Sequence, residues 1–458
     1  MKICVLGGGG SRAIMLAKSL LQKAGALGIT EIVFMDINQE LLDIFGGMAK
    51  KAASMIDNTV QVSCTTDPIS AITNSDFIIT TIRAGGDESR VFNERIALSH
   101  GLIGQETTGA GGFAMAMEAI PGISDYCRLV REYAKKDALV FNFTNPSGLV
   151  TQAMRQLGYD FVYGVCDAPS GFLRQIAKLR QVPIEDFNMD VFGLNHLSYF
   201  TSITEKGIDI TEELLNDSRL YTETDMRYFE PELAKRWGML FNEYLYYFYY
   251  REKAVENINN STVTRGESIL SINKEMVKEL RNLNPESDFE KMLDIYSKYN
   301  HQREISYMAA ESSIRRNEAV APKFDLFSID DGGYAGIALA FINAKITGNK
   351  SEMVLCVPNN GTVNWLKDDD IIETTCSIGE FGAIPKKGMK ELPDSAMTLI
   401  RTMKLYERLA SQAILNKDKG LAAEALMVHP LVNSYSLAKS LVHSYLEIKT
   451  SNIGEWRA

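Results

Sequence analysis

The first 36 residues carry the feature that most constrains the fold: an apolar run, a glycine cluster and an acidic residue, in that order. Residues 2–7 (KICVLG) are apolar and lead into GGGGSR, residues 7–12, after which helical apolar spacing continues to residue 26. A second apolar run, residues 32–35, ends at Asp36. A strand, a tight glycine turn, a helix and a strand ending in a carboxylate are typical of a β-α-β unit that binds a dinucleotide.

Each part of this unit has a physical role in such binding. Glycines let the backbone approach a pyrophosphate, and the free N–H groups and positive dipole end of the following helix attract it. A carboxylate at the end of the second strand accepts hydrogen bonds from a ribose diol and repels a 2′-phosphate, which favours NAD over NADP. A tight turn without a ligand is the alternative. The residues expected to contact the cofactor are Gly7, Gly9, Gly10, Ser11, Arg12 and Asp36.

Further apolar runs extend the pattern of strands alternating with helices. Runs at residues 77–82 and 138–143 predict buried strands, so residues 1–190 are expected to form a Rossmann-type, doubly wound parallel sheet of the α/β class. Residues 191–458 are expected to form a second, α+β and mainly helical domain for substrate, metal and subunit contacts. This domain has amphipathic stretches at 231–255 and 286–313, a possible strand at 353–357 and closing helices at about 395–415 and 419–447.

Composition excludes several classes of partner. The chain has 48 Lys and Arg against 58 Asp and Glu, a formal charge of −10, which disfavours nucleic acid and anionic membranes. No segment approaches the ~20 apolar residues of a membrane span, and the first apolar run is too short for a signal peptide. We therefore expect a cytoplasmic protein whose six scattered cysteines are thiols, mostly small core residues.

Two later segments combine a strand end with metal-binding residue types: GVCDAP at 164–169 and GLNHLSYF at 193–200. Each begins with glycine after an apolar run, and ligands of open α/β sheets bind at such strand ends. A Cys166 thiolate and a neutral His196 imidazole suit a divalent transition ion that keeps open positions for substrate oxygens. Residue type and spacing alone favour a buried thiol and a core histidine instead.

The ordered motifs resemble glycoside hydrolase family four. The resemblance rests on GGGGSR, IRAGGDESRVFNERIALSHGLIGQETTGAGG (82–112), NFTNPSG (142–148), GVCDAP and GLNHLSYF, and continues through NEYLYY (242–247), TRGE (264–267), GGYA (332–335), VPNNG (357–361) and ALMVHPLV (425–432). It runs over nearly the full length. It implies a fold close to lactate and malate dehydrogenases, NAD and usually Mn²⁺ or another divalent metal as cofactors, and a homodimer or homotetramer.

The resemblance also implies that the chain hydrolyses a phosphorylated disaccharide by a redox route, the exception to the usual two-carboxylate mechanism of glycosidases. NAD accepts a hydride from C3 of the sugar, and the metal-polarised ketone acidifies the C2 hydrogen. A base removes that proton, and the aglycone leaves from C1 by elimination. Water then adds, and C3 is reduced again, so no net oxidation results.

The resemblance also implies roles for individual residues, at the positions where this sequence matches the motifs of the family. Cys166 and His196 match the metal ligands, and Asp167 matches the general acid of members that cleave α-linked 6-phosphoglucosides. It favours a substrate of the maltose 6′-phosphate type, although Ala168 departs from the Cys-Asp-Met-Pro pattern. Tyr244 matches the base, a phenol whose pKa a nearby cation must lower. Alternatives for the base are Tyr246, Tyr247, Tyr249 and Tyr250. Sugar contacts are expected at Arg90, Asn145, Asn195 and Arg265.

Three alternatives stay open on the sequence alone. The first is a 6-phospho-β-glucosidase or an unphosphorylated α-glycosidase of the same family. The second is an NAD-dependent hydroxy-acid dehydrogenase, which needs a histidine–aspartate relay and an arginine clamp but no metal; the pair Cys166 and His196 argues against it. The third is a cofactor-binding protein without turnover, which the presence of both Cys166 and Asp167 disfavours.

Overall fold

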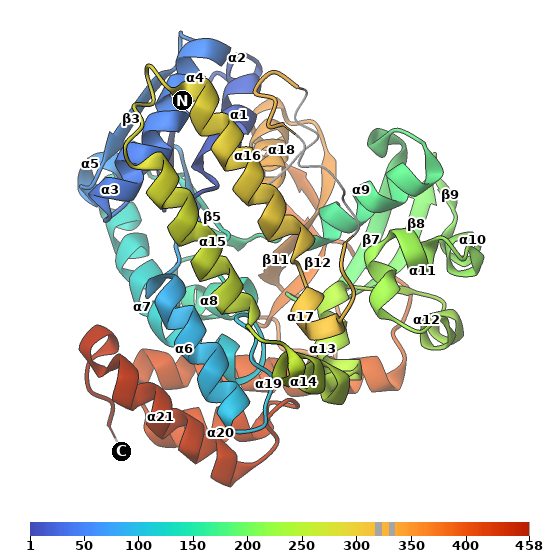
Figure 1. The fold of residues 1–458 in the computed structure, drawn as a ribbon. Coiled ribbons are helices and arrows are strands. Elements are labelled where there is room, and N and C mark those ends of the chain that lie inside the picture. The colour runs from blue at the N-terminus through green and yellow to red at the C-terminus, as the bar shows by residue number, and fades with distance from the viewer. Residues whose placement is uncertain (317–322, 329–334, 458) are drawn as a thin grey trace.

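The structure, a computed structural model, describes residues 1–316, 323–328 and 335–457 (Figure 1). Residues 332–334 of the GGYA segment lie outside the described residues. The strands are β1 (Lys2–Leu6), β2 (Glu31–Met35), β3 (Gln61–Thr65), β4 (Phe77–Thr80), β5 (Leu139–Asn142), β6 (Val162–Gly164), β7 (Phe187–Leu194), β8 (Leu197–Glu205), β9 (Ile208–Asp209), β10 (Leu240–Phe241), β11 (Ser351–Pro358), β12 (Ile371–Gly379) and β13 (Gly382–Pro385).

Helices connect and cover these strands. In the first half they are α1 (Ala13–Gln22), α2 (Ala24–Leu27), α3 (Gln39–Leu41), the π-helix η1 (Leu42–Gly46), α4 (Gly47–Ile56), α5 (Pro68–Ile72), α6 (Gly86–Ser99), α7 (Gly109–Tyr133), α8 (Ser147–Gln156), α9 (Ala168–Arg180) and η2 (Ile184–Asp186). Next come α10 (Thr211–Asn216), α11 (Leu220–Glu223), η3 (Asp225–Tyr228), α12 (Pro231–Trp237), η4 (Glu243–Leu245), α13 (Tyr246–Tyr249), α14 (Arg251–Asn260), α15 (Arg265–Leu280), α16 (Phe289–Ile305) and α17 (Ala309–Ser312). The last are α18 (Gly336–Thr347), α19 (Asp394–Asn416), α20 (Lys419–Val428) and α21 (Tyr435–Ile453).

The N-terminal strands form the predicted doubly wound sheet. Six parallel strands lie in the order β3-β2-β1-β4-β5-β6, and the chain reverses its direction of growth between β1 and β4. Alternate residues of β1 enter two different cores: Ile3 and Val5 belong to one buried cluster, Cys4 and Leu6 to the other. A strand buried on both faces requires such a continuous apolar run. The predicted fold class is therefore confirmed.

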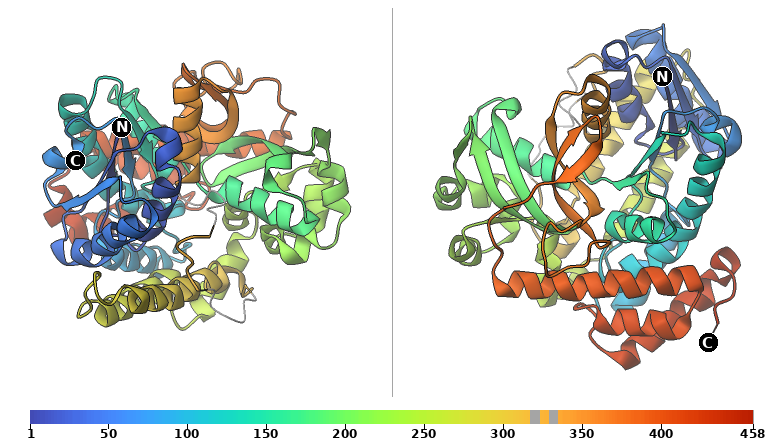
Figure 2. Two further views of the ribbon diagram at one scale, coloured as in Figure 1. Left: turned by 90° about the horizontal axis from the view of Figure 1, so that it is seen from above. Right: turned by 180° about the vertical axis from the view of Figure 1, so that it is seen from behind.

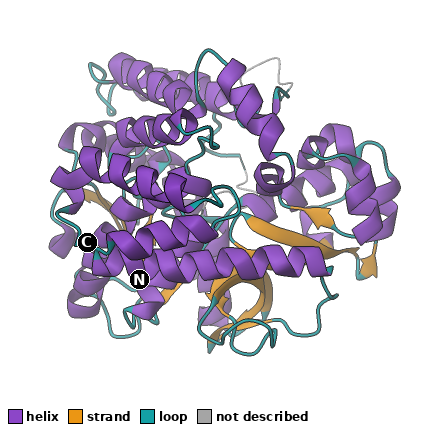
Figure 3. Cartoon of the chain, turned by 90° about the horizontal axis from the view of Figure 1, so that it is seen from below, coloured by secondary structure: helices purple, strands orange, loops and turns teal. Residues whose placement is uncertain are grey.

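Helices pack on both faces of this sheet. Seen from below, helices dominate the view, and strands come to the surface at its lower and right-hand edges (Figure 3). On one face α1 packs against α4, and α16 from the second half of the chain also contacts α4. On the other face α7 packs against α5 and α8, while the long helix α19 crosses α7 and α8. Among the described residues, no helix combines the length and the apolar content needed to cross a membrane.

The sheet does not stop at the predicted domain boundary near residue 190. Antiparallel strands continue it in the order β11-β12-β7-β8-β10, because β11 pairs with β6 through Cys356 and Gly164. Seen from behind, β11 and β12 lie between the N-terminal strands and the strands of the second half (Figure 2). Strands from before and after residue 190 thus share one sheet among the described residues. The division of the chain at residue 190 into a cofactor domain and a substrate domain remains a prediction.

The amphipathic stretch at 231–255, in the region expected to be mostly helical, is divided among several elements and includes a short strand. Helix α12 ends at Gly238, which adopts the left-handed conformation (φ 62°) typical of a helix C-terminus. Leu240 and Phe241 then pair with β8 as β10, and the chain resumes in η4, α13 and α14. The apolar spacing was real, but tertiary pairing with β8 overrides helix propensity here. The stretch 286–313 holds the expected helix as α16 and α17.

Candidate active site and metal centre

The structure places the glycine loop against the carboxylate of Asp36, which directly follows β2. The backbone N–H groups of Gly7 and Gly8 donate to Met35 O at 2.9 and 2.8 Å, and Gly9 N–H donates to Asp36 Oδ2 at 2.9 Å. A Cβ on Gly8 would lie 2.7 Å from Phe34 Cβ, so this glycine is needed for the loop to lie against β2. Helix α1 begins at Ala13, whose backbone N–H donates to Gly10 O at 2.9 Å and so joins the helix to the loop.

The structure brings Cys166 and His196 together from separate strand ends. Cys166 follows β6, and His196 occupies the two-residue turn between β7 and β8 with a left-handed φ of 62°. Cys166 Sγ lies 3.5 Å from His196 Nε2, and both line one cavity of about 340 Å³. Burial lowers the pKa of His196 to about 4, so the imidazole is neutral, the form that binds metals.

This pair fits a metal site that is completed by non-protein ligands. His196 Nδ1 is buried without a hydrogen-bond partner among the described residues, and burial raises the pKa of the Cys166 thiol well above its usual value. A cation held between the two side chains would displace the thiol proton and take the lone pair of His196 Nε2, the ring nitrogen that faces Cys166, so that Nδ1 carries the ring proton. No group of three His, Cys, Asp or Glu residues suitable for a metal occurs among the described residues. Substrate or water oxygens would therefore fill the other positions.

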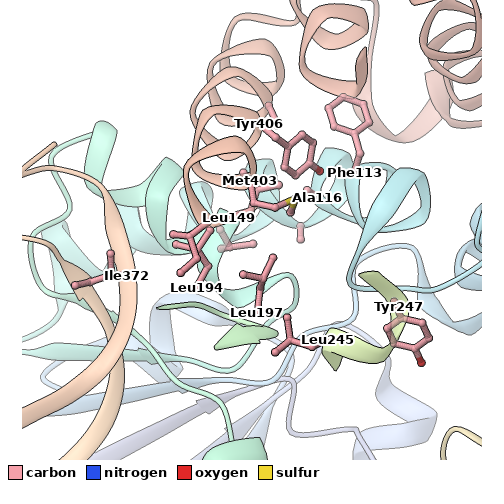
Figure 4. Close-up of a cluster of buried hydrophobic side chains, with 14 of the residues drawn as sticks. Phe113, Ala116, Leu149, Leu194, Leu197, Leu245, Tyr247, Ile372, Met403 and Tyr406 are labelled. Atoms are coloured by element: carbon pink, nitrogen blue, oxygen red, sulfur yellow. The ribbon is translucent and has the colours of Figure 1, made fainter. Parts of the chain in front are cut away.

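An apolar cluster supports the turn that carries His196 (Figure 4). Leu194 and Leu197 flank the turn and pack with Leu149 of α8 and Met403 of α19, and Leu245 lies beside them. The three leucines at 194, 197 and 245 are at most 1% exposed. Burial of each leucine side chain stabilises the fold by about 1.5–3 kcal/mol. This packing holds the turn of His196 in place.

Asp167 and Tyr244 line the same cavity as the candidate metal ligands. Asp167 is the residue before α9, and electrostatic interaction links its carboxyl to Arg12 of the glycine loop. The ring of Tyr244 stacks on His196 with 3.9 Å between centroids and 14° between planes. Burial and the neighbouring Glu243 carboxyl raise the pKa of Tyr244 well above its usual value. Among the described residues, these effects therefore favour the neutral phenol over the phenolate at Tyr244.

The structure separates Tyr244 from most of its aromatic neighbours. Tyr247 also lines the cavity, whereas Tyr246, Tyr249 and Tyr250 point elsewhere. Tyr246 OH donates to Glu311 O at 3.2 Å, and the Tyr249 hydroxyl lies 2.5 Å from that of Tyr199. Tyr250 OH accepts from the backbone N–H of Glu230 at 3.0 Å. Of the five tyrosines predicted as candidates for the base, Tyr244 and Tyr247 thus line the cavity.

Three of the four expected sugar-contact residues reach the cavity: Arg90, Asn145 and Arg265. Asn195 does not line it. Its Nδ2 donates to Glu373 Oε1 at 3.0 Å, and its Oδ1 accepts from the backbone N–H of Gly148 at 3.3 Å. Because both ends of the amide are used inside the protein, this side chain faces away from the sugar space.

Sequence analysis missed a buried charge network beside Arg90. The Nε of Arg90 lies 2.8 Å from Glu94 Oε1, one helical turn further along α6, and both side chains are buried. Arg90 Nη1 also contacts Glu106 Oε2 at 3.1 Å, and Glu106 pairs with Arg83. Burial alone would raise the pKa of Glu106, yet the two arginines hold it well below its usual value. Glu106 and Arg83 lie in the motif at 82–112 that contributes to the family resemblance, and this motif was the only hint in the sequence that they belong to the site.

A further cation reaches the glycine loop from α16. Arg303 lines the cavity and its Nη1 donates to Ser11 Oγ at 2.6 Å and to Asn273 Oδ1 at 3.2 Å. Burial and, after it, the positive charge of the nearby Arg12 lower the pKa of Arg303 to about 10. Such a cluster suits an anionic ligand. No pattern in the sequence connects Arg303 with Ser11, which lies 292 residues away.

Two relatives span nearly the whole chain. A 6-phospho-beta-glucosidase of Escherichia coli is 30% identical over 453 residues, which cover 95% of this chain and 92% of the relative. The phospho-alpha-glucosidase PagL of Clostridium acetobutylicum is 27% identical over 99% of this chain and 98% of its own length. Relatives of either anomeric specificity thus match end to end.

A solved structure matches the fold as a whole. The 6-phospho-beta glucosidase from Thermotoga maritima, with manganese, NAD⁺ and glucose-6-phosphate, superposes with a TM-score of 0.81 at 28% identity and covers 99% of each chain. The family model described as Family 4 glycosyl hydrolase matches residues 2–182, and the model of its C-terminal domain matches residues 191–432. The chain therefore belongs to glycoside hydrolase family four.

Proposed function

We propose that this chain hydrolyses 6-phosphorylated glucosides by oxidation at C3, proton loss at C2, elimination at C1, addition of water and re-reduction at C3. The observation that carries the proposal is the 3.5 Å approach of Cys166 Sγ and His196 Nε2 in a cavity beside the glycine loop. Bound there, NAD would supply a hydride acceptor and Mn²⁺ a Lewis acid for the C2 and C3 oxygens. The manganese, NAD⁺ and glucose-6-phosphate of the Thermotoga maritima structure support this assignment.

The protein's own residues take defined roles in this proposal. Cys166 and His196 hold the cation, and the glycine loop with Asp36 orients the dinucleotide. Tyr244, stacked on His196, takes the C2 proton, and a cation held by that imidazole would lower the pKa that burial raises. Asp167 protonates the leaving oxygen.

Recognition of the sugar phosphate fits the arginines around the cavity. Arg90 and Arg265 line it, and Arg303 binds neutral oxygens of Ser11 and Asn273. Guanidinium groups match phosphate oxygens with several directed donors. Glu311 also lines the cavity, is 2% exposed, and its Oε2 has no hydrogen-bond partner among the described residues. Such an atom suits a sugar hydroxyl as its donor.

Asp167 supports an α-linked substrate such as maltose 6′-phosphate. The second candidate is a 6-phospho-β-glucosidase, favoured by the 30% identity to the Escherichia coli β-glucosidase against 27% to PagL. A panel of maltose 6′-phosphate, cellobiose 6′-phosphate and free maltose, each with NAD and Mn²⁺, separates the candidates. Turnover of maltose 6′-phosphate is expected, and turnover of the cellobiose ester alone would reverse the anomeric assignment. Net accumulation of NADH would favour a dehydrogenase instead.

The Asp167→Asn variant tests the general acid. Cleavage of unactivated disaccharides is expected to fall about 100-fold or more, while aryl glycosides with good leaving groups lose little, because their departure needs little protonation. Equal losses on both substrates would remove this role. Deuterium incorporation at C2 of the product in heavy water is expected, and its absence would exclude elimination.

A further inference from the structure

We propose that Glu373 is a positioning residue that holds the His196 imidazole and the Tyr244 phenol in a fixed relation to each other. Glu373 lies on β12, is 1% exposed and does not line the cavity. It therefore acts through other residues. The inference rests on the proposed function, in which His196 holds the cation and Tyr244 removes the proton.

The first branch from Glu373 leads to the turn of His196. Its Oε1 accepts from Asn195 Nδ2 at 3.0 Å, and Asn195 Oδ1 accepts from the backbone N–H of Gly148 at 3.3 Å. The Gly148 donor fixes which end of the amide faces β12, because a flipped Asn195 would place donor against donor. This branch thus anchors the turn in which His196 keeps its left-handed φ of 62°.

The second branch leads to Tyr244. Glu373 Oε2 accepts from Ser198 Oγ at 2.7 Å, and Ser198 Oγ accepts from Asn242 Nδ2 at 3.3 Å. Asn242 Oδ1 in turn accepts from the backbone N–H of Tyr244 at 3.0 Å. Ser198 and Asn242 are fully buried, so water does not compete for these bonds. The hydroxyl and the amide both donate in the direction of the carboxyl group.

Donors reach both oxygens of one carboxyl, and this explains the residue type: Asn195 Nδ2 and, at 4.0 Å, Cys356 Sγ donate to Oε1, and Ser198 Oγ donates to Oε2. A glutamine at position 373 has one oxygen acceptor and would satisfy only one branch. Because Asn195 cannot flip, the glutamine oxygen is expected to face Asn195 and its NH₂ group to face Ser198, whose hydroxyl then loses its acceptor. Because each branch uses its own oxygen of Glu373, the two branches can be cut separately. Residues that fix the orientation of a metal-binding histidine commonly change metal affinity about 10- to 100-fold when they are mutated.

The experiment compares four variants with the wild-type enzyme. Asn195→Ala cuts the first branch, Ser198→Ala cuts the second, and Glu373→Gln tests the junction. Asp370→Asn is the matched control: Asp370 is fully buried directly before β12, but it pairs with Arg408 and belongs to neither branch. Mn²⁺ affinity is measured by electron paramagnetic resonance of the free ion, and NAD affinity and Tm report the integrity of the fold. The rate of C2 exchange in heavy water and the separate kcat and KM report the base.

The branches predict different losses. Asn195→Ala is expected to weaken Mn²⁺ binding about tenfold or more, with NAD affinity unchanged. Ser198→Ala and Glu373→Gln are expected to keep Mn²⁺ affinity within about threefold and to lower kcat and C2 exchange about tenfold with little change in KM. Asp370→Asn should lower Tm and leave the metal affinity and kcat of the folded enzyme as in the wild type.

Two kinds of failure are distinguishable. If Asn195→Ala binds Mn²⁺ as tightly as Asp370→Asn, or if Ser198→Ala and Glu373→Gln turn over normally, the positioning role of Glu373 is refuted. If the wild-type enzyme itself binds no Mn²⁺ or shows no exchange at C2, the proposed function fails instead.

Discussion

Replacing Gly9 with alanine tests whether the glycine loop and Asp36 act as one cofactor-binding unit. A Cβ at this position would lie 2.9 Å from both Cγ and Oδ2 of Asp36. Ordinary contact begins at about 3.4 Å, so the carboxyl must retreat by roughly 0.5 Å. Asp36 Oδ1 already accepts from the backbone N–H of Asn38 at 3.0 Å, so the carboxyl is held from both sides. A retreat of this size breaks its 2.9 Å bond to Gly9 N–H or displaces the group that meets the ribose.

The expected cost follows from one hydrogen bond to a charged group, about 1.5–3 kcal/mol, or about 10- to 100-fold in NAD affinity. Gly25→Ala is the control, because a Cβ there would meet nothing within 4 Å and Gly25 is not among the expected cofactor contacts. Neither glycine has a positive φ, so alanine is compatible with both backbones. Titration calorimetry with NAD⁺ measures the two affinities. Equal affinities of the two variants would refute the steric reasoning.

The remaining predictions concern the metal, acid stability and the core. Cys166→Ser is expected to abolish turnover and weaken Mn²⁺ binding while NAD affinity is kept; full activity in EDTA would contradict this. The folded pKa of Glu106 lies below its usual 4.5, so its contribution to stability is present above about pH 4.5 and is lost as the pH falls. The difference in unfolding free energy between wild type and Glu106→Gln, from urea titration, should shrink between about pH 6 and pH 3.5; a constant difference would exclude the linkage. Arg408→Met leaves the fully buried Asp370 carboxylate without its ion-pair partner and should lower the free energy of unfolding by about 3 kcal/mol in the same assay. A decrease of less than about 1 kcal/mol would argue against a stabilising pair.

Several parts of the molecule follow from local sequence alone. The apolar run of β1, the glycines and Asp36 predicted the β-α-β unit, because each step depends on neighbouring residues and on backbone freedom. The family followed from short motifs in a fixed order. The amphipathic stretch at 231–255 does not form one continuous helix, because Gly238 and the pairing of Leu240 with β8 override an apolar spacing that suits a helix.

Only the tertiary structure decided which side chains meet. Sequence placed Cys166 and His196 at strand ends, but their 3.5 Å separation depends on β6, β11, β12 and β7 lying side by side in one sheet. Asn195 was expected to face the sugar, and the same sheet turns its amide toward Glu373 on β12. The physical reason is that strand register and packing fix the direction of a side chain through partners far away in sequence, which no local pattern encodes.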